Sequence, residues 1–289
     1  MTTATTTPPT PHDPITPVFG RRRPYRLPDV GDYAAGVAEA ERLWAAGDFL
    51  RGTDVFEQVL LAHPRKCVPL LARLYDLYQT MPGRENRYDL YQRRHYDFGI
   101  RPGDRVLDVG SGNVPLPLAT HQAEFAIDND RFGRAGQPMR RLDGVRLVQA
   151  SVQRLPFADK SFDFVYCSHI MEHVVDPVAA CAELSRVARR GYIESPTRAK
   201  DLWMDQARCS NHNWFLSLKP DGRTLVFDQY TEEELTGLAC DVLMKMHCDP
   251  RSDREKAFSA LIYLRPQQIN TCLLWEGGVR CEVRLAAGR

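Results

Sequence analysis

The sequence predicts an α/β protein: a doubly wound, mostly parallel sheet with an N-terminal helical cap and a C-terminal antiparallel hairpin. Three observations predict this class. Apolar residues recur at helical spacing over 32–98, and short apolar runs then alternate with helical patterns as far as residue 195. Toward the C-terminus, strand-like runs are joined by the turn pairs Asp221-Gly222 and Gly277-Gly278.

The helical cap is expected to contain four helices. The first covers 33–47, and the second runs from Leu50 to Ala62, where His63-Pro64 ends it. The third covers 68–79 with a leucine stripe, and a fourth starts near Arg84.

Five parallel strands are expected after the cap. They are the runs RVLDVG, EFAID, VRLVQA, FDFVYCS and RGYIES, apolar as buried strands are. PLPLATHQ is expected to start a helix, since proline is tolerated in a first turn. A second helix is expected to follow FDFVYCS directly and to continue to about Val187.

The remaining segments predict a hairpin over 214–227, a helix begun by Thr231 with Glu234 in a capping box, a helix near 252–262, and a last hairpin over 271–285. The expected organisation is an unstructured arm at 1–28, the cap at 29–99, and a catalytic domain at 100–289 with a lid or insert at 197–230. The arm contains Arg21, Arg22 and Arg23, which are expected to be solvated; the alternative is an anion-binding arm that closes over a substrate.

Composition limits the possible functions. The 38 basic and 37 acidic residues give a formal net charge of +1, so nucleic acid is not an expected partner. No apolar run suits a membrane span and the N-terminus lacks the apolar core of a signal peptide, so a cytoplasmic protein is expected. The eight cysteines contain no C-x-x-C pair and are expected to be reduced thiols.

A glycine turn follows the first expected strand. Gly110 and Gly112 allow close approach of a ligand to the backbone, as nucleotide sites require. A nicotinamide dinucleotide site is the alternative, but its G-x-G-x-x-G pattern fails because Pro115 replaces the third glycine. Asp128, about 20 residues beyond the turn, suits a ribose-binding carboxylate; the alternative is a helix cap.

The motifs VLDVGSGN, AIDND, LPFADKSFDFVYCSHIMEHVVDP and RVARRGYIESP occur in this order. With them the chain resembles class I S-adenosylmethionine-dependent methyltransferases of the group called methyltransferase domain 11, over about residues 86–196. The resemblance implies a Rossmann-like fold and S-adenosylmethionine as cofactor. It implies that the cofactor contacts Asp108, Gly110, Ser111, Gly112, Asp128, Asn129, Ser151, Val152 and Ser168. Relatives have an acidic residue where Ser151 stands.

His169, Glu172 and His173 form H-x-x-E-H and are expected on one face of a helix. They are the candidate bases for the reaction. The same string occurs in zinc metallohydrolases, the alternative from another reaction class; a packing role for Glu172 and His173 is a further alternative. Relatives in quinone synthesis place carboxylates here around a metal, but His169 departs from that pattern, so a divalent metal is possible and not expected.

The acceptor is expected to be a small molecule of secondary metabolism, apolar with an anionic head such as an isoprenoid phosphate or an aromatic acid. Six aromatic side chains are candidates for an apolar wall, although most suit a core: Tyr88, Tyr91, Tyr96, Trp203, Trp214 and Phe215. Six arginines are candidates for the anion: Arg93, Arg94, Arg134, Arg140, Arg141 and Arg198. A protein acceptor, a homo-oligomer, and a binding-only relative without catalysis remain alternatives.

Overall fold

The computed structural model of the protein describes residues 19–128, 137–205, 211–235 and 241–286. A six-stranded sheet lies at its centre, with strand order β10-β7-β6-β3-β4-β5, and all neighbours are parallel except β10 and β7. Its strands are β3 (Val106–Val109), β4 (His121–Glu124), β5 (Arg146–Gln149), β6 (Phe162–Ser168), β7 (Ala188–Pro196) and β10 (Asn270–Glu276). The predicted doubly wound, Rossmann-like fold class is confirmed.

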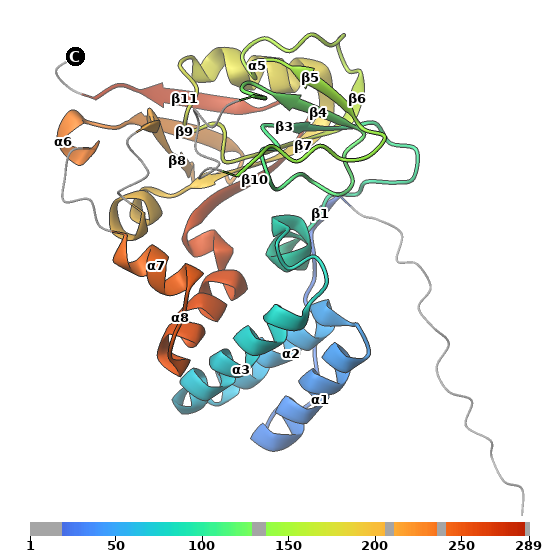
Figure 1. Ribbon diagram of the computed structural model, residues 1–289, viewed down its shortest axis with the longest axis vertical. Helices are drawn as coiled ribbons and strands as arrows, with labels where there is room; N and C mark the ends of the chain where they lie inside the picture. Colours follow the sequence, from blue (N-terminus) through green and yellow to red (C-terminus); the bar gives the residue numbers. More distant parts are fainter. Residues whose placement is uncertain (1–18, 129–136, 206–210, 236–240, 287–289) are drawn as a thin grey trace, which may run out of the picture.

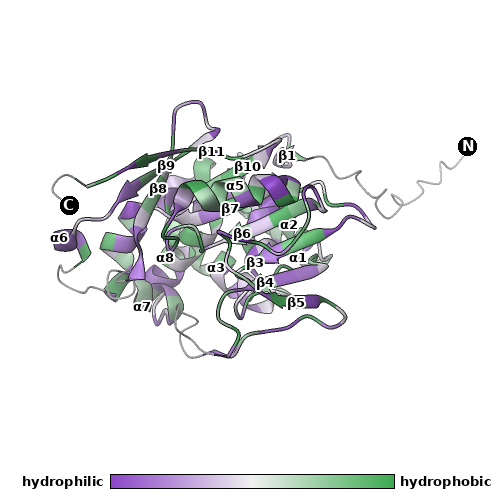
Figure 2. Ribbon diagram, turned by 90° about the horizontal axis from the view of Figure 1, so that it is seen from above, coloured by the Kyte–Doolittle hydropathy of each residue, from purple (hydrophilic) through white to green (hydrophobic). Residues whose placement is uncertain are grey.

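Helix α5 (Pro177–Val187) covers one face of this sheet (Figure 1). The side chain of Asp176 caps its first turn by accepting a hydrogen bond from the Ala179 N–H, and Pro177 suits the first helical position. Both colours appear on α5 in Figure 2, because Ala180 and Leu184 face the sheet while polar residues face outward.

A smaller sheet has the order β11-β9-β8, made of β8 (Trp214–Leu218), β9 (Thr224–Gln229) and β11 (Arg280–Arg284). The hairpin of β8 and β9 is confirmed, but the last predicted hairpin is wrong. After the turn at Gly277, β11 leaves β10 and pairs in parallel with β9. The turn therefore joins two sheets, and β10 alone supplies the antiparallel edge of the large one.

The helical cap is confirmed as α1 (Tyr33–Ala45), α2 (Phe49–Ala62) and α3 (Cys67–Thr80), followed by a π-helical turn η2 (Tyr88–Gln92) and the short α4 (Arg93–His95). The C-terminal helix α8 (Asp253–Leu264) packs on α3 and shares its apolar core, which Figure 1 shows below the sheet. Helices α6 (Glu232–Leu235) and α7 (Val242–Cys248) are short. No helix in the described ranges is long and apolar enough to cross a membrane.

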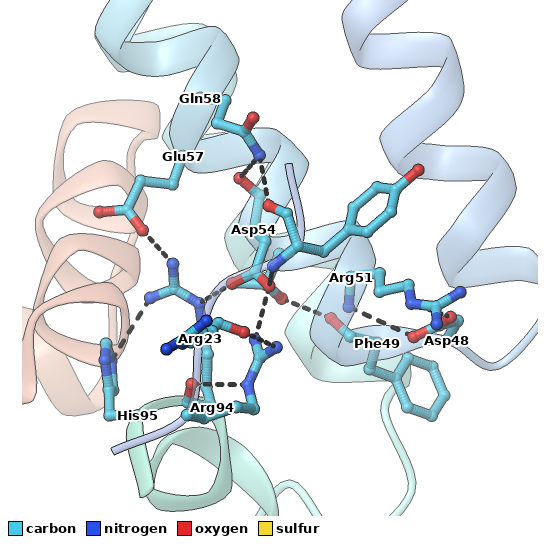
Figure 3. A network of polar contacts seen from close by, with 12 residues as sticks. Arg23, Asp48, Phe49, Arg51, Asp54, Glu57, Gln58, Arg94 and His95 are labelled. Carbon is cyan, nitrogen blue, oxygen red and sulfur yellow. Dashed lines mark hydrogen bonds and ion pairs between the residues drawn. The ribbon is translucent and has the colours of Figure 1, made fainter. Parts of the chain in front are cut away.

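A buried ion network joins α2, α4 and the segment before α1 (Figure 3). Asp54 accepts hydrogen bonds from Arg94 Nε at 3.2 Å, from Arg22 Nη2 at 2.5 Å and from the Tyr25 N–H at 2.7 Å. Arg94 also pairs with Glu57. The prediction of a solvated arm is therefore wrong for Arg22, whose charge is neutralised by Asp54. Nearby, β1 (Gly20–Arg21) pairs with β2 (Tyr96–Asp97).

The region after the glycine turn differs from the prediction in two ways. Residues 113–120 form turns rather than a helix, and the second strand is His121–Glu124, earlier than EFAID. The physical reason is Gln122, which is fully buried yet satisfied. Its amide donates to Ser111 Oγ at 2.8 Å and to the Arg140 carbonyl at 3.0 Å, and it accepts from the Leu142 N–H at 2.9 Å.

Candidate active site

The glycine turn lies where β3 ends, at the carboxyl edge of the parallel strands. Gly110 and Gly112 have φ of 70° and 53°, the left-handed region that favours glycine. A Cβ on Gly110 would stand 2.0 Å from Ile170 Cδ1, so the turn also packs too closely for a side chain. Gly110, Ser111 and Gly112 all line a cavity of about 930 Å³.

Asp108 lies behind this turn and does not line the cavity. Its Oδ2 accepts from the Leu116 N–H at 2.7 Å, while Oδ1 is buried without a hydrogen-bond partner. Burial raises the pKa of this carboxyl to about 7. The structure gives Asp108 a place that supports the turn; contact with a cofactor stays a prediction.

The acidic residue at the end of the second strand is Glu124. Its Oε2 accepts from the Gly112 N–H at 2.9 Å, and the side chain lines the cavity. Asp128 does not end a strand, because β4 stops four residues earlier; it is exposed and is not among the cavity residues. Asn129 lies outside the described residues. The expected strand-end carboxylate therefore exists, at a position that the sequence pattern did not indicate.

The other predicted cofactor neighbours do meet at the cavity. Ser151 and Val152 follow β5, and Ser168 closes β6. All three line the same cavity as the glycine turn. Their side-by-side strands explain this, since the carboxyl ends of β3, β4, β5 and β6 lie along one edge.

The H-x-x-E-H segment is a turn, not the predicted helix. His169 has φ of 58°, a left-handed conformation that a helix cannot include, and α5 begins only at Pro177. The turn nonetheless brings His169, Glu172 and His173 into the cavity. A zinc metallohydrolase site would need this motif on a helix, so the structure contradicts that alternative.

Two buried glutamates flank His169. Its Nδ1 lies 3.4 Å from Glu172 Oε1 and its Nε2 lies 3.5 Å from Glu194 Oε1. Burial alone would raise the pKa of Glu194, but contacts with His169 and Tyr192 lower it to about 2. The pKa of Glu172 is likewise lowered, since contact with His169 and nearby histidines outweighs burial. Contact with the imidazole therefore favours the ionised form of both carboxylates.

Glu194 also ties the cap to the sheet. It accepts from Tyr91 Oη at 2.6 Å and from Gln92 Nε2 at 2.8 Å, both on η2, and from Asn270 Nδ2 at 2.8 Å on β10. The orientation of His169 thus depends on three elements that meet at one buried carboxylate. No sequence pattern indicated Glu194, because its role depends on partners about 80 to 100 residues away.

Three lysine and arginine side chains among the described residues line the cavity, namely Arg84, Arg87 and Lys200, and the sequence had assigned none of them to the anion. Arg87 Nη1 lies 3.4 Å from Ser168 Oγ, and Lys200 Nζ donates to Asn270 Oδ1 at 3.1 Å. Of the predicted arginines, Arg94 and Arg198 are paired with glutamates. These two do not line the cavity, and the same holds for Arg93, Arg140 and Arg141. Arg134 lies outside the described residues.

Of the predicted aromatic wall, only Tyr91 lines the cavity. Tyr96 and Trp214 are core residues at 5% exposure each, whereas Trp203 is 75% exposed. The remaining cavity residues come partly from α7 and α8, among them Met244, His247, Ile262 and Tyr263. The helices after residue 240 therefore complete the wall that the sequence assigned to the cap and the insert.

His212 is another functional candidate that the sequence did not single out. It precedes β8 and lines the cavity, its Nδ1 lies 2.8 Å from Asp201 Oδ2, and its ring packs edge-on to His173 at 4.7 Å. Ligand atoms of Glu172, His173 and His212 all lie within 4.8 Å of one another, close enough to hold a metal ion.

Comparison with known proteins finds similarity to methyltransferases over part of the chain. Residues 107–193 match the family model for a methyltransferase domain. A demethylmenaquinone methyltransferase of Mycobacterium sp. (strain KMS) is 38% identical over 125 residues, which are 42% of this chain and 53% of that protein. Cycloartenol-C-24-methyltransferase 1 of Oryza sativa subsp. japonica is 31% identical over 38% of this chain and 35% of its own length.

The chain thus matches about half the length of the first of these relatives. Among solved structures, an S-adenosylmethionine-dependent methyltransferase from Thermotoga maritima matches with 24% identity over 35% of this chain and 48% of its own, at a TM-score of 0.27. Residues 107–193 are similar to class I, S-adenosylmethionine-dependent methyltransferase domains, and the resemblance inferred from the motifs is confirmed.

S-adenosylmethionine is the cofactor of this class, and the residues present fit it. A turn with two left-handed glycines, a carboxylate at the end of β4 and a hydroxyl at the end of β6 line one cavity. The turn would offer backbone groups to the methionine part of the cofactor, Glu124 would accept from the ribose hydroxyls, and Ser151 and Val152 would lie beside the adenine; these contacts stay predictions.

Proposed function

We propose that the chain is a methyltransferase that transfers the methyl group of S-adenosylmethionine to a small-molecule acceptor with an anionic group. The observation that carries this proposal is the continuity of the cavity. Its glycine turn suits the cofactor, Arg87 Nη1 lies 3.4 Å from Ser168 Oγ, and Lys200 and His169 line the same cavity. The relatives named above are named for small-molecule acceptors, which favours the same class here.

The cofactor supplies an activated methyl group, so the protein has to align and shield the acceptor. Arg87 and Lys200 would bind the anionic group close to Ser168. The walls from α7 and α8, with Met244 and Ile262, would exclude water from the apolar part of the acceptor.

His169 is the base that the geometry favours for an acceptor that loses a proton. It directly follows Ser168, and its ring lies 3.4 Å and 3.5 Å from two carboxylates. The two carboxylates orient the ring, because each faces one ring nitrogen. Glu172 and Glu194 would then act as positioning residues, a change from the equal roles that the sequence gave Glu172, His169 and His173.

The test is incubation of the purified chain with methyl-labelled S-adenosylmethionine and a panel of carboxylate- and phosphate-bearing metabolites, read by mass spectrometry. Label in a small acceptor supports the proposal. The KM for that acceptor should rise in Arg87→Met and stay unchanged in Arg101→Met, a control at an exposed turn. Cofactor binding with label found only in protein would overturn the small-molecule assignment.

A further inference from the structure

A second set of side chains lies in the cavity beside the proposed base His169 and shares Glu172 with it. Glu172, His173 and His212 come from the turn after β6 and from the residue pair before β8, about 40 positions apart. Their ligand atoms nevertheless gather within 4.8 Å of one another. We propose that these three residues form a binding site for a divalent transition metal such as zinc.

Each of the three is oriented by a partner on its far side. The Nδ1 of His212 lies 2.8 Å from the Asp201 carboxylate, and the Nδ1 of His173 lies 3.2 Å from the Asn211 carbonyl. Both acceptors require a proton on Nδ1, which leaves the Nε2 lone pair of each histidine free. Outer partners of this kind fix the tautomer and ring orientation of metal-binding histidines.

The carboxylate is held in the same way. Glu172 Oε2 accepts from Ser195 Oγ at 2.9 Å, so Oε1 is the oxygen that faces the histidines. His173 Nε2 stands 4.0 Å from that Oε1. Ligand atoms of a tetrahedral zinc lie roughly 3.3 Å apart, so closing this pair around an ion needs a shift of under about 1 Å.

The outer shell is itself anchored. Asp201 is buried at 2% exposure and also accepts from Tyr230 Oη at 2.6 Å, which holds it against the residue that follows β9. Asp201 orients His212 toward His173 and Glu172. Packing alone does not explain this arrangement, since apolar residues would fill the same space at a lower cost of desolvation.

The donor set selects the class of ion. Two imidazoles and one carboxylate suit zinc and its neighbours, whereas magnesium and calcium prefer oxygen ligands alone. Three protein ligands leave a fourth tetrahedral position, which faces the cavity because all three residues line it. A water molecule or an oxygen of the acceptor would occupy that position.

The experiment measures metal binding on the whole chain, purified with a tag that contains no histidine and freed of metal by chelation. Titration calorimetry with zinc should give one equivalent per chain. Cobalt should give the visible absorption of a tetrahedral site without the near-ultraviolet band of thiolate ligands. In His212→Ala the affinity should fall roughly tenfold or more, and it should stay unchanged in His247→Ala, a histidine that lines the cavity outside the cluster.

Melting curves of each apo variant show whether it is folded, and His173→Ala provides a second test if His212→Ala is not. The proposal is overturned if the wild type binds less than stoichiometric zinc, if His212→Ala and His173→Ala bind as tightly as the wild type, or if a thiolate band shows that cysteines hold the cobalt. Binding of S-adenosylhomocysteine, measured on the same samples, reports separately on the proposed methyltransferase function.

Discussion

Replacing Glu124 by glutamine should weaken cofactor binding, whereas the matching change at Asp128 should not. Glu124 ends β4, lines the cavity and is held by the Gly112 N–H at 2.9 Å. Glutamine keeps an acceptor for that N–H and removes only the charge. Asp128 is exposed and outside the cavity, so Asp128→Asn is a control of equal chemistry.

The size of the effect follows from the hydrogen bonds lost. A hydrogen bond to a charged acceptor contributes about 1.5–3 kcal/mol, and two ribose hydroxyls would share the Glu124 carboxylate. A loss in this range raises Kd by roughly 10- to 150-fold. For Asp128→Asn the expected change is less than about twofold.

Titration calorimetry with S-adenosylhomocysteine measures both variants without turnover. Glu124 is buried at 8% exposure, so its replacement can also affect folding. Circular dichroism therefore has to show that each variant is folded. If Asp128→Asn weakens binding more than Glu124→Gln does, the assignment of the ribose contact to the end of β4 is wrong.

Three further predictions concern stability, the glycine turn and pH. Asp54→Ala removes a carboxylate partner of the buried Arg94 and should lower the free energy of unfolding by about 3 kcal/mol, measured by urea unfolding. Glu39→Ala breaks an exposed ion pair and should lower it by only about 0.5 kcal/mol. Gly110→Ala should abolish measurable binding of S-adenosylhomocysteine. Gly277 also has a positive φ, of 80°, but open space around it, so Gly277→Ala should bind normally. Equal binding by both variants would contradict the close approach at the glycine turn. Because burial raises the pKa of Asp108 to about 7, the native state holds a proton that the unfolded chain releases, and stability is lost as pH rises from about 4 through about 7. Asp108→Asn lacks this loss, so its stability relative to wild type should increase by about 2–3 kcal/mol between about pH 5 and pH 8; a constant difference would show that Asp108 does not titrate in this range.

Apolar periodicity predicted most of the fold because it reports burial directly. Helices α1 to α3 and strands β3, β6 and β7 are apolar on their buried faces, and each lies where the pattern placed it. The pattern failed at β4, where Gln122 is buried among hydrogen-bond partners up to 20 residues away. A buried amide satisfied by distant groups looks like a loop residue in sequence.

The candidate site was predictable where a local motif fixes the backbone, and less so where residues meet from different elements. The glycine turn and Ser168 could be found because the turn directly follows the apolar strand β3 and Ser168 ends the apolar strand β6. Arg87 and His212 could not, since no local pattern relates them to the strand ends that they face. His169 shows a third case: the motif was found, but a left-handed residue replaced the helix expected there.

The most direct test of the account is transfer of a deuterium-labelled methyl group from S-adenosylmethionine by the purified chain, followed together with calorimetric binding of S-adenosylhomocysteine. The account predicts one cofactor bound per chain, label recovered in a small anionic acceptor, and loss of both in Gly110→Ala. A folded chain that binds neither S-adenosylmethionine nor S-adenosylhomocysteine would contradict it.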